Sequence, residues 1–586
     1  MQPSRPLRPL LLVLALLPAC GAAEMPSSAA APSSAPPLAD SMVSTTPTVA
    51  APAPMPRRRA PVPPGSAALL TGRFASSQGD MDTAALAYQR ALAADITNDD
   101  LRQQAFLTSL MAGRPEAERL AGLLARNQAA QLLLAGRDAK AGAWAQAEAR
   151  FAALPREGAA EVMRPMLIAW AQYGRGQPDA ALATLQPLID NRSFRAFYAL
   201  HGALIADLAD RRSLAARLYA TARTEFGGTA HLQLGRQVAS WEARHGSAAE
   251  AEAALRAMVA GNDDITLALP RLLADVATPP VRNALDGLAE TYVAIASVLR
   301  SQDTGDFALA LCRLALQLRP DHTVARLLAS EIVANGKRPE TALDLLGAIS
   351  PDDPLQPVVQ MRQVRLLQRL DRSDEALRLL QDVAQTHPDR PEPMGLMGDI
   401  LRIKRRFPEA VVAYDRAIAL SGPPQPAHWP LYYDRGIALE RSREWDRAEA
   451  DFLQALRFAP DQPHVLNYLG YSWAEQGRNL ERAKEMIERA VQQRPNDGAM
   501  VDSLGWVAMR MGDIATAVRL LERATELEPG DATVTGHLGD AYWEAGRRLE
   551  ALFQWRRALN LKPEPDEKER IEGRLRPAEQ TLGITP

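Results

Sequence analysis

The C-terminal part of the chain repeats itself with a period of 34 residues. Four features recur at this offset, namely Leu504-Gly505 as Leu538-Gly539, Ala517 as Ala551, Ala524 as Ala558 and Pro529 as Pro563. A unit of this length is too short to enclose a core of its own, so it must bury its apolar face against its neighbours. The period therefore predicts an all-α solenoid, in which each unit is a hairpin of two helices.

Residue types within one unit indicate how its two helices meet. Gly539 lies where a side chain would block the approach of the paired helix, and Ala551 is small for the same reason. Tyr542 and Trp555 are large enough to fill the space between helices. Pro563 ends the second helix, because proline cannot continue one.

This pattern resembles the tetratricopeptide repeat, which implies a superhelix that holds another protein. The small central residue recurs along most of the chain, usually at intervals of 34 residues. We predict it at Ala84, Ala117, Ala147, Ala181, Ala215, Ala249, Ala308, Ala342, Ala376, Ala410, Ala448, Ala483, Ala517 and Ala551. The period fails between Ala249 and Ala308, where Pro270 and Pro279-Pro280 interrupt the helical pattern. We expect an irregular connection there, with a hinge between two arms.

These boundaries predict six segments. They are a lipoprotein signal peptide (1–19), a lipidated cysteine and disordered Ala/Pro/Ser linker (20–66), divergent N-terminal repeats (67–257), an irregular helical connection (258–289), a C-terminal repeat array (290–565) and a capping helix with a tail (566–586). The linker has almost no aliphatic bulk, so it cannot bury enough apolar surface to fold.

The first residues have the pattern of an export signal. Arg5 and Arg8 precede a short apolar run, Leu10 to Leu17. Leu17-Pro18-Ala19-Cys20 resembles the bacterial lipobox, although Pro18 departs from its usual residue type. That resemblance implies a lipid on Cys20, and Gly21 after it implies the outer membrane. The alternative is cleavage after Gly21-Ala22-Ala23, which would release a soluble periplasmic protein.

Composition and motifs exclude several function classes. The net charge is −3, so the chain lacks the excess of basic residues that is typical of proteins that bind nucleic acid. No phosphate-binding glycine loop, metal-spaced histidine pair or Gly-x-Ser-x-Gly turn occurs, so we expect no enzyme activity, cofactor or metal. Ser503, His537 and Asp540 are triad residue types, but they lie on successive repeats without a nucleophile turn. The second cysteine, Cys312, is expected to be a buried apolar thiol.

The repeat register predicts which side chains line the concave groove. In the resembled family, positions 2, 5, 9 and 12 of each first helix face inward. For the C-terminal units this places the following residues in or beside the groove: His464, Asn467, Tyr468, Tyr471, Asp502, Trp506, His537, Asp540 and Trp543. Aromatic rings beside amides and carboxylates suit an extended peptide. For Trp506 and Trp543, packing between repeats is the alternative. The Lys and Asn of a carboxylate clamp are missing at positions 5 and 9.

Residues 430–565 show a closer resemblance. The segment LNYLGYSWAEQGRNLERAKEMIERAVQQRPNDGAMVDSLGWVAMRMGD, followed by HLGDAYWEAGRRLEALFQWRRAL, is similar to the C-terminal repeats of large proteobacterial outer-membrane lipoproteins. That group includes a partner of a carboxyl-terminal processing protease. The resemblance implies an adaptor that binds a periplasmic serine protease and its cell-wall hydrolase substrates. The alternative is a scaffold of an outer-membrane secretion, pilus or exopolysaccharide machine.

Overall fold

The computed structural model describes residues 65–190, 194–227, 232–300 and 305–583. Within these ranges the chain is helical and has no strand, which confirms the all-α class. The signal peptide, Cys20 and the linker up to residue 64 lie outside the described residues. The chain divides into two compact units, Met1–Leu370 and Asp371–Pro586. The segment 258–289, where the sequence predicts a connection between arms, therefore lies inside the first unit.

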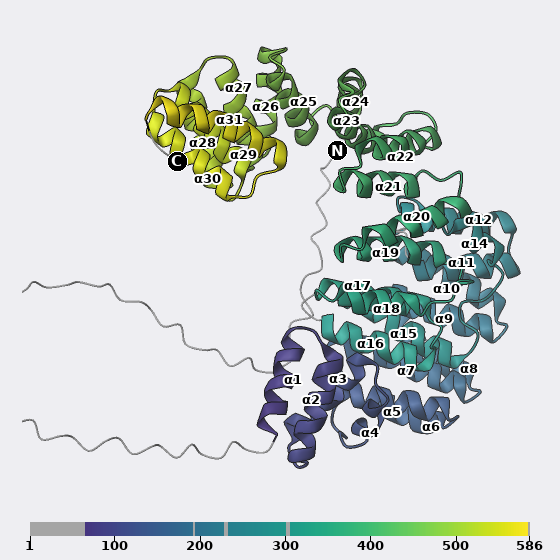
Figure 1. Cartoon of the computed structure of the whole chain (residues 1–586). Helices are drawn as coiled ribbons and strands as arrows, with labels where there is room; N and C mark the ends of the chain where they lie inside the picture. The colour runs from purple at the N-terminus through teal and green to yellow at the C-terminus, as the bar shows by residue number, and fades with distance from the viewer. Residues whose placement is uncertain (1–64, 191–193, 228–231, 301–304, 584–586) are drawn as a thin grey trace, which may run out of the picture. The chain divides into compact units, whose positions relative to one another are not determined.

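The first unit contains the helices α1 to α19 (Figure 1). They are α1 Ser66–Ser77, α2 Met81–Ala94, α3 Asp99–Ala112, α4 Glu116–Ala121, α5 Gln128–Lys140, α6 Trp144–Ala152, α7 Gly158–Gly174, α8 Pro178–Asp190, α9 Arg195–Leu208, α10 Arg212–Glu225, α11 Leu232–His245, α12 Ala248–Val259, α13 Asp263–Thr266, α14 Leu269–Ala274, α15 Ala284–Leu299, α16 Gly305–Leu318, α17 Thr323–Asn335, α18 Pro339–Gly347 and α19 Gln356–Arg369.

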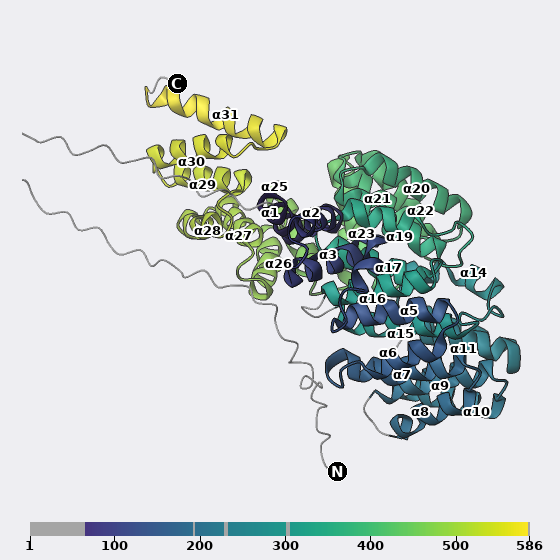
Figure 2. The ribbon, with the colours of Figure 1, turned by 90° about the horizontal axis from the view of Figure 1, so that it is seen from below.

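The second unit continues the same hairpin pattern to the C-terminal helix. Its helices are α20 Ser373–Thr386, α21 Glu392–Ile403, α22 Phe407–Leu420, the short 3-10 helix η1 Pro426–His428, α23 Trp429–Arg441, α24 Trp445–Phe458, α25 Pro463–Glu475, α26 Leu480–Gln493, α27 Gly498–Arg510, α28 Ile514–Leu527, α29 Ala532–Glu544, α30 Arg548–Asn560 and α31 Pro565–Thr581. Figure 2 shows α31 lying over α30 at the end of this stack.

The repeated alanines lie where the two helices of a hairpin touch. Every predicted central alanine except Ala249 is fully buried. Apart from Ala117 in α4, each of these is the fourth residue of its second helix. Ala249 is exposed, and the fourth residue of α12 is Ala251, which is 1% exposed. The prediction was therefore wrong by two positions in this hairpin, because α10 ends at Glu225 and α11 begins only at Leu232, a longer connection than the period assumes.

Glycines at the contact between paired helices have the predicted steric role. A Cβ atom on Gly539 would lie 2.5 Å from the indole of Trp555, and one on Gly398 would lie 2.5 Å from the ring of Tyr414. Both distances are too short for carbon atoms, so only glycine lets these helices approach. Trp555 itself is 1% exposed, as expected for a ring that fills the space between repeats. Cys312 is also fully buried, and burial raises the pKa of its thiol to about 12.

The corrected register gives a matched pair of substitutions. Ala251→Leu should lower the free energy of unfolding by about 1–3 kcal/mol, because extra methylenes overpack the α11–α12 contact. Ala249→Leu should change it by less than about 0.5 kcal/mol, since that side chain points to solvent. Urea denaturation followed by circular dichroism measures both. Equal effects of the two variants would contradict the register described here.

The first unit folds back on itself. Helix α15 packs against α7, α9 and α5, and α16 packs against α3 and α5, so helices that follow the irregular segment lie against the first arm (Figures 1 and 2). A Cβ on Gly287 of α15 would lie 2.2 Å from the buried Trp170 of α7, so this glycine permits the close contact. Among the described helices, none has the length and apolar character needed to cross a membrane.

Candidate functional site

Three of the predicted groove residues form a row across the inner helices of the second unit. Tyr471 of α25 lies 6.2 Å from His537 of α29, measured between ring centroids. Trp506 of α27 stacks on the same imidazole at 4.1 Å, with 24° between the ring planes. The repeat register therefore brings side chains from three successive hairpins together.

One further groove residue, Asp502, holds this row in place. The Nδ1 atom of His537 lies 2.9 and 3.1 Å from the two carboxylate oxygens of Asp502, and both side chains are buried. Burial by itself lowers the pKa of His537, but the carboxylate of Asp502 outweighs it and the net pKa is raised. The pair is therefore a buried contact that favours the protonated imidazole.

The capping helix α31 closes the end of the row. Asp540 accepts a hydrogen bond of 2.9 Å from Nε1 of Trp555 and is ion-paired with Arg570 of α31. The guanidinium of Arg570 lies 5.9 Å above the ring of Trp506. As a result Trp506 is only 6% exposed. Its ring therefore packs within the chain, which is the alternative that the sequence left open. Nothing in the repeat register predicts Arg570 in this place.

The remaining groove residues are more accessible. His464 is exposed, while Asn467, Tyr471 and Trp543 are half-buried. Trp543 lies 5.5 Å from Trp555 and has the guanidinium of Arg548 4.0 Å above its ring. Both neighbours of this indole belong to its own hairpin.

Two buried polar atoms of the inner face have no hydrogen-bond partner among the described residues. They are Oδ1 of Asn467 and Nε1 of Trp506. Tyr471 lies on the same helix as Asn467, one turn further on, and burial raises the pKa of its hydroxyl. Unpaired buried polar atoms are uncommon in folded proteins, because they lose their hydrogen bonds to water. Oδ1 of Asn467 is therefore an unused acceptor on a half-buried side chain, whereas Nε1 of Trp506 belongs to an indole that the chain itself covers.

The triad residue types are each engaged in other contacts. The hydroxyl of Ser503 donates to the backbone oxygen of Ala499 at 2.9 Å. His537 contacts Asp502, and Asp540 contacts Trp555 and Arg570. In the described part of the chain, no cluster of three or more His, Cys, Asp or Glu side chains could hold a metal ion.

A second polar cluster, which the sequence analysis missed, lies in the first unit. Nε1 of Trp170 donates to Nδ1 of His201 at 2.9 Å, and burial lowers the pKa of His201 to about 4. The nearby carboxylate of Glu290 on α15 is buried and accepts a hydrogen bond of 2.6 Å from Gln233. The one signal in the sequence was an acidic residue within the apolar run of α15.

His322 connects this cluster to the start of α17. Its Nδ1 atom accepts the backbone N–H of Ala325 at 3.3 Å and so caps the helix. Because Nδ1 is an acceptor, the ring proton lies on Nε2, which is 3.2 Å from Glu290. Burial by itself raises the pKa of Glu290, but His322 and other partners hold it below its usual range.

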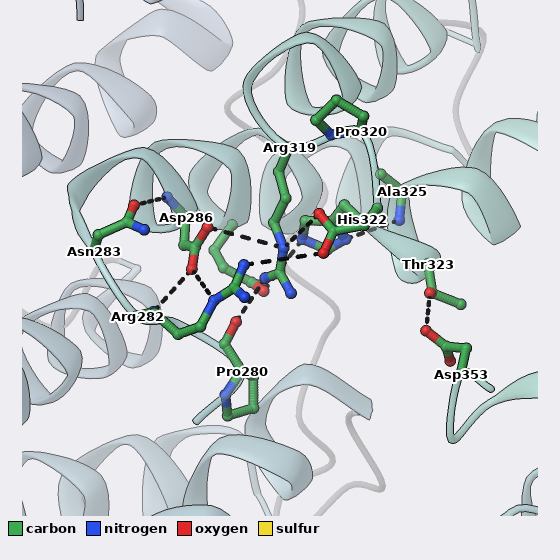
Figure 3. Close-up of polar contacts among 12 residues, drawn as sticks. Pro280, Arg282, Asn283, Asp286, Arg319, Pro320, His322, Thr323, Ala325 and Asp353 are labelled. Carbon is green, nitrogen blue, oxygen red and sulfur yellow. Dashed lines mark hydrogen bonds and ion pairs between the residues drawn. The ribbon is translucent and has the colours of Figure 1, made fainter. Parts of the chain in front are cut away.

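Figure 3 shows how Arg319 bridges the surrounding segments. Its Nη1 atom donates to the backbone oxygen of Pro280 at 2.6 Å, and its Nε atom lies 3.9 Å from Asp286. Asp286 in turn accepts hydrogen bonds of 2.9 and 3.0 Å from the backbone N–H and the side chain of Arg282. These contacts hold the loop before α15 against the turn between α16 and α17.

The fold and the side chains on its inner face define a class of protein. Hairpins of helices stack side by side, and their inner faces carry aromatic and polar side chains without a reactive constellation. Residues 361–426, 433–498 and 503–563 match the sequence model of the tetratricopeptide repeat family. This part of the chain is therefore a tetratricopeptide-repeat array.

Relatives share only part of their length with this chain. A TPR repeat-containing protein of Pseudomonas aeruginosa, PA4667, is 28% identical over 179 residues, which is 30% of each protein. Superkiller complex protein 3 of Mus musculus is 23% identical over 150 residues, or 25% of this chain and 10% of the mouse protein. The chain thus spans less than a third of either relative.

Solved structures with a similar arrangement have low sequence identity to this chain. The Cut9-Hcn1 heterotetramer of the APC/C matches at 16% identity and a TM-score of 0.37, covering 88% of this chain and 96% of that one. A tetratricopeptide repeat protein from Parabacteroides merdae has the same identity and TM-score, with 43% and 97% covered. Yeast Tom70 matches at 14% identity and a TM-score of 0.32, with 89% and 96% covered.

Proposed function

We propose that this chain is a protein-binding scaffold whose second unit holds an extended segment of another polypeptide on its inner face. The observation that carries this proposal is the unpaired Oδ1 of Asn467 beside the half-buried ring of Tyr471, one turn further along α25. An extended peptide has a backbone N–H for this acceptor. The half-buried ring of Tyr471 offers an apolar surface for a side chain of the bound segment.

We further propose that the partner is a periplasmic carboxyl-terminal processing protease, together with its cell-wall hydrolase substrates. Support comes from the resemblance of residues 430–565 to the repeats of outer-membrane lipoproteins. Cys20 would carry the lipid anchor, and the Pro/Ala-rich linker would hold the repeats away from the membrane. Such a scaffold raises the effective concentration of enzyme and substrate for each other and performs no reaction itself.

Recovery of partners from living cells tests the adaptor role. The full chain, crosslinked and purified from membrane extracts, should bring down a serine protease with a PDZ domain. A Cys20→Ser chain should move to the soluble fraction, because it lacks the anchor. Recovery of secretion, pilus or polysaccharide-export components in place of the protease would contradict the adaptor role. Recovery of the Cys20→Ser chain with the membranes would contradict the lipid anchor.

Substitutions on the inner face test the peptide site itself. Asn467→Ala and Tyr471→Ala should each weaken binding of the recovered partner by about tenfold, which corresponds to one hydrogen bond or one packed ring. Helical content, measured by circular dichroism, should stay unchanged, since both side chains are only half-buried. Gln492→Ala, on an exposed position of α26, is the matched control. Unaltered affinity in both inner-face variants would exclude this face as the binding site.

A further inference from the structure

The first unit contains a cavity of about 470 Å³ among its inner helices. Side chains of α9, α11, α15, α17 and α19 line it. This volume lies within the range of about 300–1,000 Å³ that is usual for sites of small molecules. The apolar part of the wall includes Phe197, Leu232, Val298, Leu327, Leu355 and Val358. Val298 is 37% exposed although it is aliphatic, so the cavity presents apolar surface that the described chain leaves uncovered.

The polar side chains of the wall already have hydrogen bonds within the chain. Gln233 donates to Glu290 at 2.6 Å, and Ser297 donates to a backbone oxygen of its own helix at 2.8 Å. Oδ1 of Asn262 accepts a backbone N–H of α13 at 3.2 Å. A peptide segment placed here would find few open partners for its backbone N–H and C=O groups, which is costly. A hydrocarbon chain has no such groups and therefore suits this wall better.

One part of the wall carries an excess of positive charge. Glu331 of α17 is shared by two arginines, since its carboxylate lies 3.3 Å from Nη1 of Arg300 and 3.5 Å from Nη1 of Arg362. All three residues line the cavity. The nearby Asp264 is already paired with Arg365, at 2.8 Å. Burial outweighs the attraction of both carboxylates and lowers the pKa of Arg362, so an anion beside this guanidinium would be stabilised.

We propose that this cavity binds a fatty acid, with its acyl chain against the apolar wall and its carboxylate at Arg300 and Arg362. A guanidinium presents its N–H groups in a planar fork that matches a carboxylate. Arg300 is 49% exposed, so a head group bound there stays in contact with water. Each methylene that leaves water favours binding, so affinity should rise with the length of the acyl chain. The inference goes beyond the proposed protein-binding function and involves none of its residues in the second unit.

Competition between small amphiphiles tests the inference with the full chain. The probe is an anthroyloxy-labelled fatty acid, whose fluorescence falls when an unlabelled competitor displaces it. Dodecanoate should compete at least about tenfold more strongly than dodecanol, because the alcohol lacks charge-assisted hydrogen bonds to the arginines. Octanoate should compete more weakly than dodecanoate, because it buries fewer methylenes. All competitors are used below their critical micelle concentrations.

Substitutions assign the two ends of the ligand. Arg300→Gln should reduce the preference for dodecanoate over dodecanol, while Arg256→Gln, at an exposed arginine of α12, should keep it. Val298→Trp should abolish probe binding by filling the cavity. Leu70→Trp, at a position of α1 that is 65% exposed, is the matched control and should leave binding unchanged. Circular dichroism and thermal unfolding show whether each variant still folds.

Several outcomes would overturn the inference. Equal competition by dodecanoate and dodecanol would remove the role of the arginines, and unchanged probe binding in a folded Val298→Trp chain would exclude the cavity. Competition by an apolar octapeptide mixture at lower concentration than dodecanoate would favour a peptide segment as the ligand instead. Tyr471→Ala should bind the probe as the wild type does, and its failure to bind would place the ligand in the second unit.

Discussion

Replacing Trp170 by alanine should lower the free energy of unfolding of the first unit by about 3–5 kcal/mol, the range for removing a buried aromatic side chain. The indole is fully buried, packs against Gly287 of α15 and donates its N–H to His201. Its loss leaves a cavity between two arms of the unit and an unpaired imidazole nitrogen, and the two effects add. Denaturation by urea, followed by circular dichroism, measures the change.

A matched control lies in the same unit. Phe74→Ala also removes an aromatic ring, but Phe74 of α1 is 69% exposed, so its loss should cost less than about 0.5 kcal/mol. If Trp170→Ala cost no more than Phe74→Ala, the packing of α15 against α7 could not be a main source of stability. The comparison thus tests the fold-back of the first unit directly.

The second large effect concerns the buried pair of Asp502 and His537. Asp502→Asn should destabilise the second unit by about 3–5 kcal/mol near pH 6, because it leaves a buried imidazolium without its partner. The folded pKa of His537 is raised above its ordinary value of 6.5. The stabilisation from the pair is therefore fully present below pH 6.5 and is lost as the pH rises through the folded pKa.

The difference between the wild type and Asp502→Asn should consequently be larger at pH 6 than at pH 9. Asp461→Asn is the control, because Asp461 forms an ion pair with Arg489 at a position that is 77% exposed. Such surface pairs contribute at most about 1 kcal/mol, so this variant should show little change at either pH. A destabilisation by Asp502→Asn that grows with rising pH would contradict the raised pKa.

The groove residues show what the repeat register can and cannot predict. Positions on one face of successive helices can be read from a 34-residue period, and Tyr471, Trp506 and His537 do meet on one face. The register cannot tell which of them stay accessible, because that depends on side chains from outside the repeat. Arg570 comes from α31, which has no equivalent in the earlier hairpins, and its contact with Asp540 covers Trp506.

The sequence by itself determined the helical hairpins and the contacts inside them. Small residues must recur where two helices touch, so they appear in the sequence at regular intervals. Only the tertiary structure decided that α15 packs into the first arm and that α9, α11, α15, α17 and α19 surround one cavity. Those contacts join segments that lie far apart in the sequence and follow no period, so they depend on how each hairpin is rotated against the next.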